Sequence, residues 1–144
     1  MEIAAQTRHE KYERLVAEAK RLPALPTAVV HPCDQSSLEG AVDAARLGLI
    51  KPILVGPTQR IRKVASEFGI DISGFTLVET EHSQASAKRA VDLVREGKAE
   101  ALMKGSLHTD ELMGEVVKTD GGLRTARRIS HCFIMDVPSH GEPL

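Results

Sequence analysis

Short, continuous apolar runs alternate along this sequence with longer segments in which apolar residues recur at helical spacing. Runs without polar alternation are typical of parallel strands that are buried on both faces. Strands that alternate with helices over short connections predict right-handed β–α–β units. The sequence therefore predicts an α/β fold, with a mostly parallel sheet of about five strands and helices on both faces. The expected strands are Thr27–Val30, Pro52–Val55, Phe75–Val78, Ala101–Met103 and Cys132–Met135.

The expected helices carry apolar stripes and begin or end at residues with known capping preferences. An amphipathic helix is predicted over Thr7–Arg21, followed by Leu22–Pro26 as a linker. Ser36 and Glu39 have the spacing of a capping box at the start of the next helix, and Ser83 is expected to cap a later one. The glycines expected to end helices, in a left-handed conformation at the first of them, are Gly48, Gly69 and Gly97.

The 144 residues fit one α/β domain, predicted over 1–144, with the leading helix at 1–22. A tail at 139–144 follows the last expected strand without a covering helix, which predicts the truncated N-terminal part of a longer protein. The net charge of -1 and the aromatic content of 3% argue against a nucleic-acid partner. No apolar run has the roughly 18 residues that a membrane span requires, so we expect no membrane association and a cytoplasmic location.

Cys33 and Cys132 are too few and too distant for a zinc motif or a disulfide framework. Each lies in or beside an expected strand, where a buried free cysteine behaves as a small apolar residue. The cysteines therefore predict no metal site.

The stretch Ala99–Leu112 concentrates polar side chains where an expected strand turns into a helix. Ligand sites in open α/β sheets lie outside the carboxyl ends of strands, and helix N-termini attract anions. An anion is expected beside the turn rather than on the helix axis, because Asp110 and Glu111 would repel it there. The residues expected to contact substrate are Lys104, Gly105, Ser106, His108 and Thr109. The alternative is that Thr109 is only an N-cap and His108 only a solvated loop residue.

Three arginines follow a glycine pair, at positions 124, 127 and 128. Arg124 and Arg128 are further candidates for substrate binding, because a guanidinium can bind phosphate through two hydrogen bonds. A solvated cluster of charges is the alternative for such a run.

Several common motifs are missing. Lys104-Gly105-Ser106 resembles the end of a Walker loop, but Ala99 occupies the position of its upstream glycine. The dinucleotide-binding glycine pattern and the G-x-S-x-G pattern of hydrolases are also absent.

Three longer segments carry a resemblance to a known family. They are TAVVHPCDQSSLEGAVDAARLGLIKPILVGP, EALMKGSLHTDELMGEVV and GLRTARRISHCFIMDVP. Together they resemble the phosphate acetyl/butyryltransferase family, and most closely the transferase part of bifunctional enoyl-CoA hydratase/phosphate acetyltransferases. The resemblance runs from about Tyr12 to Pro138.

The resemblance implies the exchange of an acyl group between coenzyme A and phosphate: acyl-CoA + phosphate ⇌ acyl phosphate + CoA. It implies a fold similar to that of isocitrate and isopropylmalate dehydrogenases, with the site in a cleft, and a possible homodimer. Gly105 and His108 match the family's G-x-x-H loop. An arginine that the acetyltransferases carry after this loop is replaced here by Met113-Gly114.

Coenzyme A and phosphate would thus be substrates, with no separate cofactor. The serine and aspartate to which the family's chemistry is usually assigned match no position here, so no catalytic residue is expected in this chain. The competing interpretations are a non-catalytic α/β module that binds a phosphorylated ligand, and a relative of the decarboxylating dehydrogenases. The second would need a cluster of carboxylates for a metal ion, and none is visible.

Overall fold

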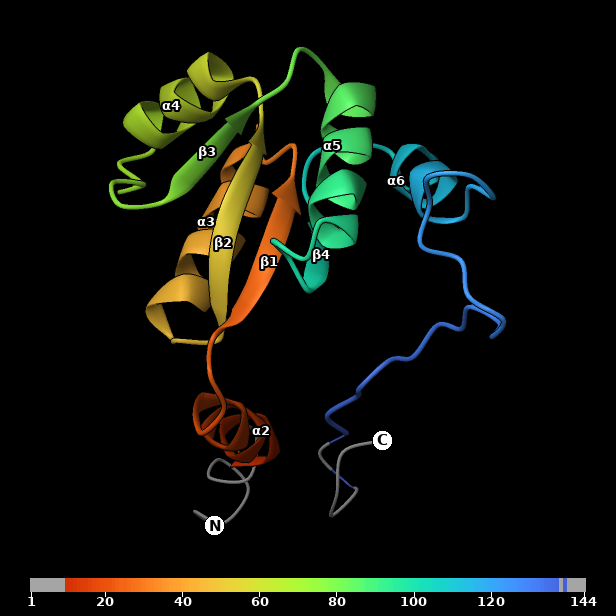
Figure 1. Cartoon of the computed structure of the whole chain (residues 1–144). Helices are drawn as coiled ribbons and strands as arrows, with labels where there is room; N and C mark the ends of the chain where they lie inside the picture. The colour runs from red at the N-terminus through yellow and green to blue at the C-terminus, as the bar shows by residue number, and fades with distance from the viewer. Residues whose placement is uncertain (1–9, 138, 140–144) are drawn as a thin grey trace, which may run out of the picture.

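A computed structural model describes residues 10–137 and 139 of the chain. Helices and strands alternate from the first described residue to Val116 (Figure 1). The helices are α2 (Glu10–Lys20), α3 (Gln35–Arg46), α4 (Thr58–Glu67), α5 (Ser83–Arg95) and α6 (Thr109–Val116). The strands are β1 (Leu25–Val30), β2 (Ile50–Gly56), β3 (Thr76–Glu79) and β4 (Ala101–Lys104).

The four strands form one parallel sheet in the order β3-β2-β1-β4. The chain first builds outward from β1 through β2 to β3, and then returns to place β4 on the other side of β1. At the end of β1, Val30 is in register with Val55 of β2 and with Lys104 of β4. The order in which the strands are added therefore reverses at β1, with β2 and β3 on one side of it and β4 on the other.

Helices cover both faces of the sheet, as predicted (Figure 1). On one face, Leu38 of α3 and Ile61 of α4 pack with Leu54 of β2. On the other face, Ala87 and Ala90 of α5 pack in the cluster that contains Ala28, Val30 and Leu112. Alanine on α5 allows this helix to approach the sheet closely, because its side chain is short.

The N-caps of two helices lie one or two residues before the predicted caps. Asp34 is the N-cap of α3 and its side chain accepts a hydrogen bond from the Ser37 amide at 2.9 Å. The capping box predicted at Ser36 is therefore wrong, because the aspartate two residues earlier already caps the helix. His82 caps α5 through its Nδ1, so Ser83 is a residue of the helix and not its cap.

The predicted glycine stops are confirmed. Gly48, Gly69 and Gly97 follow α3, α4 and α5 with φ angles of 75°, 64° and 76°. A side chain in this left-handed region would be strained, and glycine relieves the strain.

The predicted fifth strand is wrong. Cys132–Met135 is neither strand nor helix. Phe133 is 71% exposed and Ile134 is 66% exposed, and Cys132 is exposed rather than buried as predicted. An apolar run forms a strand only where a neighbouring strand supplies hydrogen-bond partners, and this segment has none among the described residues.

Helix α2 begins at Glu10, and the first residues of the predicted Thr7–Arg21 helix lie outside the described residues. The helix lies beyond the amino ends of the strands, near the extended C-terminal segment (Figure 1). The Lys11 ammonium lies 3.5 Å from the Asp136 carboxylate and joins the two segments. The apolar stripe of α2 is largely exposed to solvent, and Tyr12 is 56% exposed. The predicted tail at 139–144 lies outside the described residues except for Ser139.

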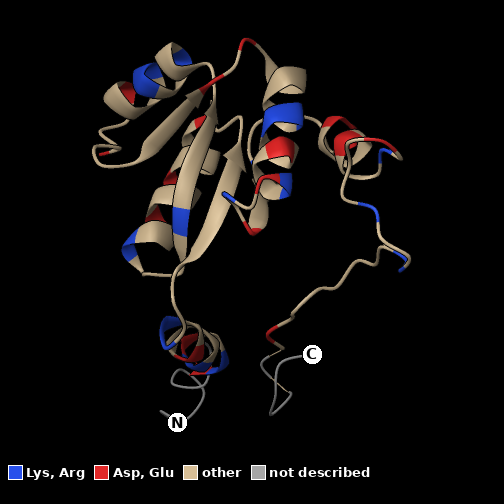
Figure 2. Cartoon of the chain, viewed as in Figure 1, with Lys and Arg blue, Asp and Glu red and all other residues tan. Residues whose placement is uncertain are grey.

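Charged residues are distributed over the helices without segregation by sign. Figure 2 shows Lys and Arg interspersed with Asp and Glu along α2, α4 and α5. In the part of the chain that the structure describes, no helix combines the length and the apolar character needed to cross a bilayer.

Candidate functional site

The carboxyl ends of β1 and β4 lie side by side at the point where the strand order reverses. The loops that leave neighbouring strands at such a point diverge toward opposite faces of the sheet, which opens a crevice for a ligand. One of these loops is His31–Asp34, and the other contains the predicted ligand-binding residues 104–109. The topology thus brings the loop after β1 and the loop after β4 to the same end of the sheet.

Gly105 brings the two loops into backbone contact. Its amide donates a hydrogen bond to the Val30 carbonyl at 2.8 Å. A Cβ atom at this position would lie 2.2 Å from the Val30 carbonyl oxygen and 2.5 Å from the His31 carbonyl oxygen. No side chain fits in that space, so the close approach of the loops requires glycine here.

Ser106 fastens the same contact. Its amide and its hydroxyl both donate to the His31 carbonyl, each at 2.8 Å. The Ser106 hydroxyl also accepts a hydrogen bond from the Cys33 amide at 3.0 Å. The hydroxyl proton is therefore already used within the chain, and Ser106 holds the loop rather than presenting a free donor.

His31 lies beneath this contact, 3% exposed, with a φ of 55° that is unusual for a residue other than glycine. Its Nδ1 lies 3.0 Å from the hydroxyl of Ser86, which is fully buried in the first turn of α5. The Ser86 hydroxyl also lies 2.7 Å from that of Thr80, after β3. Burial, reinforced by the positive charge of Arg60, lowers the pKa of His31 and favours its neutral form.

Lys104, His108 and Thr109 are the exposed members of the predicted set. His108 is the N-cap residue of α6 and makes no capping hydrogen bond with its side chain. The alternative that Thr109 caps this helix is wrong, because Thr109 is its first residue. The first amides of a helix have no partners within it, and no side chain caps them here. The Lys104 ammonium favours an anion beside the turn, whereas the carboxylates of Asp110 and Glu111 in the first turn of α6 oppose one on the helix axis.

Acidic groups limit where an anion could lie. The Asp34 carboxylate has a lowered pKa, chiefly because Ser37 donates to it and in lesser part because of the positive charge of Lys104. An anion at Lys104 would therefore compete with Asp34 for that charge. In the first turn of α6, Glu111 Oε2 is buried and has no hydrogen-bond partner among the described residues.

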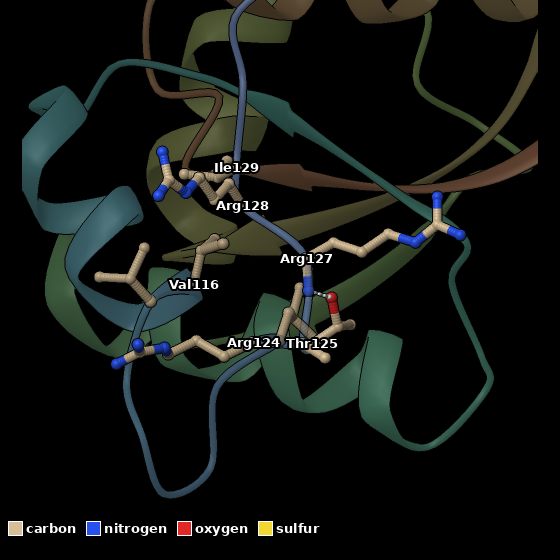
Figure 3. A pocket seen from close by; sticks show the side chains of 9 residues that line it. Val116, Arg124, Thr125, Arg127, Arg128 and Ile129 are labelled. Atoms are coloured by element: carbon tan, nitrogen blue, oxygen red, sulfur yellow. Dashed lines mark hydrogen bonds between the residues drawn. The ribbon is translucent and has the colours of Figure 1, made fainter.

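The arginines lie at the other end of α6. Leu123 donates its amide to the Val116 carbonyl, which brings the arginine segment to the C-terminal end of the helix. Arg124, Arg127 and Arg128 line a groove of about 780 Å³ that also includes Val116. In Figure 3, Arg124 and Arg128 extend to one side around Val116, and Arg127 extends to the other. Among the described residues, no hydrogen bond or ion pair in the structure joins these arginines to the loop at 104–109, so the predicted site residues fall into two groups, one at each end of α6.

Sequence reasoning missed the buried part of the site. It named none of His31, Ser86 and Thr80 as a site residue. A histidine directly after a buried strand was a signal, but its partners become neighbours only through the strand order. Among the described residues, no group of three or more His, Cys, Asp or Glu side chains could hold a metal ion.

The fold and the loop contacts define an α/β protein with a parallel sheet in which two loops meet at the carboxyl ends of β1 and β4, where the strand order reverses. The chain is 55% identical over 134 residues to a phosphate acetyltransferase of Rhizobium meliloti, an alignment that covers 93% of this chain and 42% of the relative. It is 30% identical over 128 residues to a phosphate butyryltransferase of Clostridium beijerinckii, covering 89% of this chain and 42% of that protein.

The chain is thus homologous to members of the phosphate acetyl/butyryltransferase family over about nine-tenths of its length. It spans about two-fifths of the length of these relatives. A branched-chain phosphotransacylase from Enterococcus faecalis shares the fold, with a TM-score of 0.51 and 21% identity, over 67% of this chain and 33% of that structure. No protein-family model matches the chain.

Proposed function

We propose that this chain forms part of a phosphate acyltransferase and supplies one wall of its phosphate and CoA cleft. The reaction is the reversible exchange of an acyl group between CoA and inorganic phosphate. The observation that carries the proposal is the loop at 104–109, held at the crevice between β1 and β4 in a chain homologous to these transferases. Lys104, His108 and Thr109 contact the phosphate, while Gly105 and Ser106 fix the loop that carries them.

The physical support lies in the division of labour within this loop. The amides of Gly105 and Ser106 and the Ser106 hydroxyl are all used in contacts with β1 and the residue after it. A loop held by three internal hydrogen bonds loses little conformational freedom on binding, which lowers the cost of association. The exposed ammonium of Lys104 then provides the charge that attracts phosphate.

Replacing Lys104 with alanine is expected to weaken binding of inorganic phosphate about tenfold, or about 1.4 kcal/mol, by removing a charge-assisted donor. The measurement is a titration of the ¹⁵N-labelled chain with phosphate, followed by the amide shifts of the loop. CoA is titrated separately in the same way, because its phosphate groups are a second source of the same chemistry.

The matched control is Lys51→Ala. Lys51 is exposed near the amino end of β2, at the opposite end of the strands from the loop, which follows the carboxyl end of β4. This variant removes the same charge from the chain, so any general effect of net charge appears in it as well. Equal affinities of Lys104→Ala and the unaltered chain for both ligands would contradict the assignment.

The 144-residue chain is expected to bind substrate but to catalyse little exchange. The serine and aspartate to which the family resemblance assigns the chemistry match no position in it. The assay is the release of phosphate from acetyl phosphate in the presence of CoA. Robust turnover would contradict this division between binding and chemistry, whereas binding of phosphate without turnover would agree with it.

The finer expectations remain part of this proposal. They are an overall fold like that of isocitrate and isopropylmalate dehydrogenases, CoA as a substrate rather than a resident cofactor, and a homodimer. Arg124 and Arg128, in the groove at the C-terminal end of α6, would bind the phosphate groups of CoA. Light scattering of the purified chain tests the homodimer directly.

A further inference from the structure

We propose that His31 is the positioning residue of the substrate loop. Its backbone carbonyl holds Ser106, and its imidazole anchors that carbonyl to the start of α5. This role deepens the proposed function and rests on it, because the loop matters for binding only if it carries the phosphate site. The His31 side chain is buried, so the proposed role needs no contact between it and the ligand.

The backbone of His31 is a junction of hydrogen bonds. Its amide donates to the Val55 carbonyl of β2 at 2.7 Å. Its carbonyl accepts from the amide and the hydroxyl of Ser106 and from the Cys33 amide at 2.9 Å. The left-handed φ of 55° sets the direction of this carbonyl. A residue that relaxed to negative φ would turn the carbonyl away and release the loop.

The contact of the His31 side chain with Ser86 stabilises this conformation. The Ser86 hydroxyl donates to the His82 carbonyl at 2.9 Å. It also lies 3.0 Å from His31 Nδ1 and 2.7 Å from the Thr80 hydroxyl. These contacts tie the imidazole to the first turn of α5 and to the residue after β3.

Charged groups around His31 determine when the ring takes up a second proton. Glu111, from α6, favours the protonated ring, whereas Arg60, from α4, and His82, before α5, oppose it. Burial is the largest influence and also opposes it. The ring therefore protonates below the ordinary histidine pKa of about 6.5. The junction is intact above that range, and falling pH should loosen it as the buried ring becomes charged.

Three variants distinguish the hydrogen bond of the imidazole from its effect on the backbone conformation. His31→Asn keeps a hydrogen-bonding group close to the position of Nδ1, and asparagine tolerates the left-handed region. His31→Ala removes that group and disfavours that region. Ser86→Ala removes the hydroxyl that contacts His31, Thr80 and the His82 carbonyl, and provides a second break in the network if His31→Ala does not fold.

The primary measurement is the amide shift of Ser106 in the ligand-free chain between pH 4.5 and 8, a range chosen to span the histidine transition. We expect a transition with its midpoint below about 6.5, which is absent in His31→Asn and retained in His82→Asn and His108→Asn. Loss of the transition with His82 or His108, or its persistence in His31→Asn, would overturn the proposal.

The second measurement is phosphate affinity at pH 7.5, where His31 is neutral. We expect about a fivefold loss or more in His31→Ala and in Ser86→Ala, and near-normal affinity in His31→Asn. Unchanged affinity in all three variants would overturn the positioning role. If the unaltered chain binds no phosphate, the proposed function fails, and the Ser106 transition still decides whether His31 holds the loop.

Discussion

Replacing Gly105 with alanine is expected to lower the free energy of unfolding by about 3 kcal/mol or more, and to abolish phosphate binding. The new methyl group would lie 2.2 Å from one carbonyl oxygen and 2.5 Å from another, both in the backbone of β1 and its loop. Backbone cannot move aside as a flexible side chain can, so β4 and β1 must separate. Urea unfolding followed by circular dichroism measures the loss.

The matched control is Gly114→Ala. Gly114 lies within α6, and a Cβ atom there would meet nothing within 4 Å. Alanine is the better helix former, so this variant should be more stable than the unaltered chain, by about 0.5–1 kcal/mol. Opposite signs for the same chemical change would attribute the effect to the loop contact. A destabilisation of less than about 1 kcal/mol for Gly105→Ala would refute the close approach.

Replacing Leu54 with alanine is expected to cost about 2–5 kcal/mol. Leu54 lies in the middle of β2, is fully buried, and packs in the cluster beneath α3 and α4. The substitution removes apolar contacts and leaves a cavity that the two helices can only partly close. Because native domains are stable by only about 5–15 kcal/mol, such a loss should be evident in the urea midpoint with an unchanged slope.

Leu22→Ala provides the same chemical change at an exposed position. Leu22 is 67% exposed and follows α2, so its effect should stay within about 0.5 kcal/mol. Phe133→Ala should be equally mild, because that side chain is 71% exposed. A large loss for Phe133→Ala would mean that the apolar segment at 132–135 is packed after all.

The sequence was sufficient to predict the alternation of strands and helices, because buried parallel strands and amphipathic helices have distinct periods. It failed at Cys132–Met135, which is as continuously apolar as the cores of the observed strands. Composition records an affinity for a buried environment, but the strand itself depends on a neighbour with free hydrogen-bonding groups. Caps failed by one or two residues because Asp34 competed with Ser36, and His82 with Ser83.

The exposed half of the candidate site was predicted, and its buried half was not. Lys104 and His108 stand out in a short polar turn. The role of His31 depends on the return of the chain to place β4 beside β1, which no local pattern encodes. Ser106 was predicted from its hydroxyl as a ligand donor, and the structure uses that hydroxyl inside the chain. The role of the Ser106 hydroxyl thus depends on the His31 carbonyl beside it, which the sequence alone does not place there.

Strand β4 has one further consequence. It pairs with β1 on one side only, so its outer edge presents unpaired backbone groups in the described part of the chain. Open edges of this kind invite a strand from another molecule, and a lysine at the edge opposes such pairing through repulsion and desolvation. Lys104 stands at the end of this edge. The same ammonium that would attract phosphate also helps to keep neighbouring molecules from joining their sheets into aggregates.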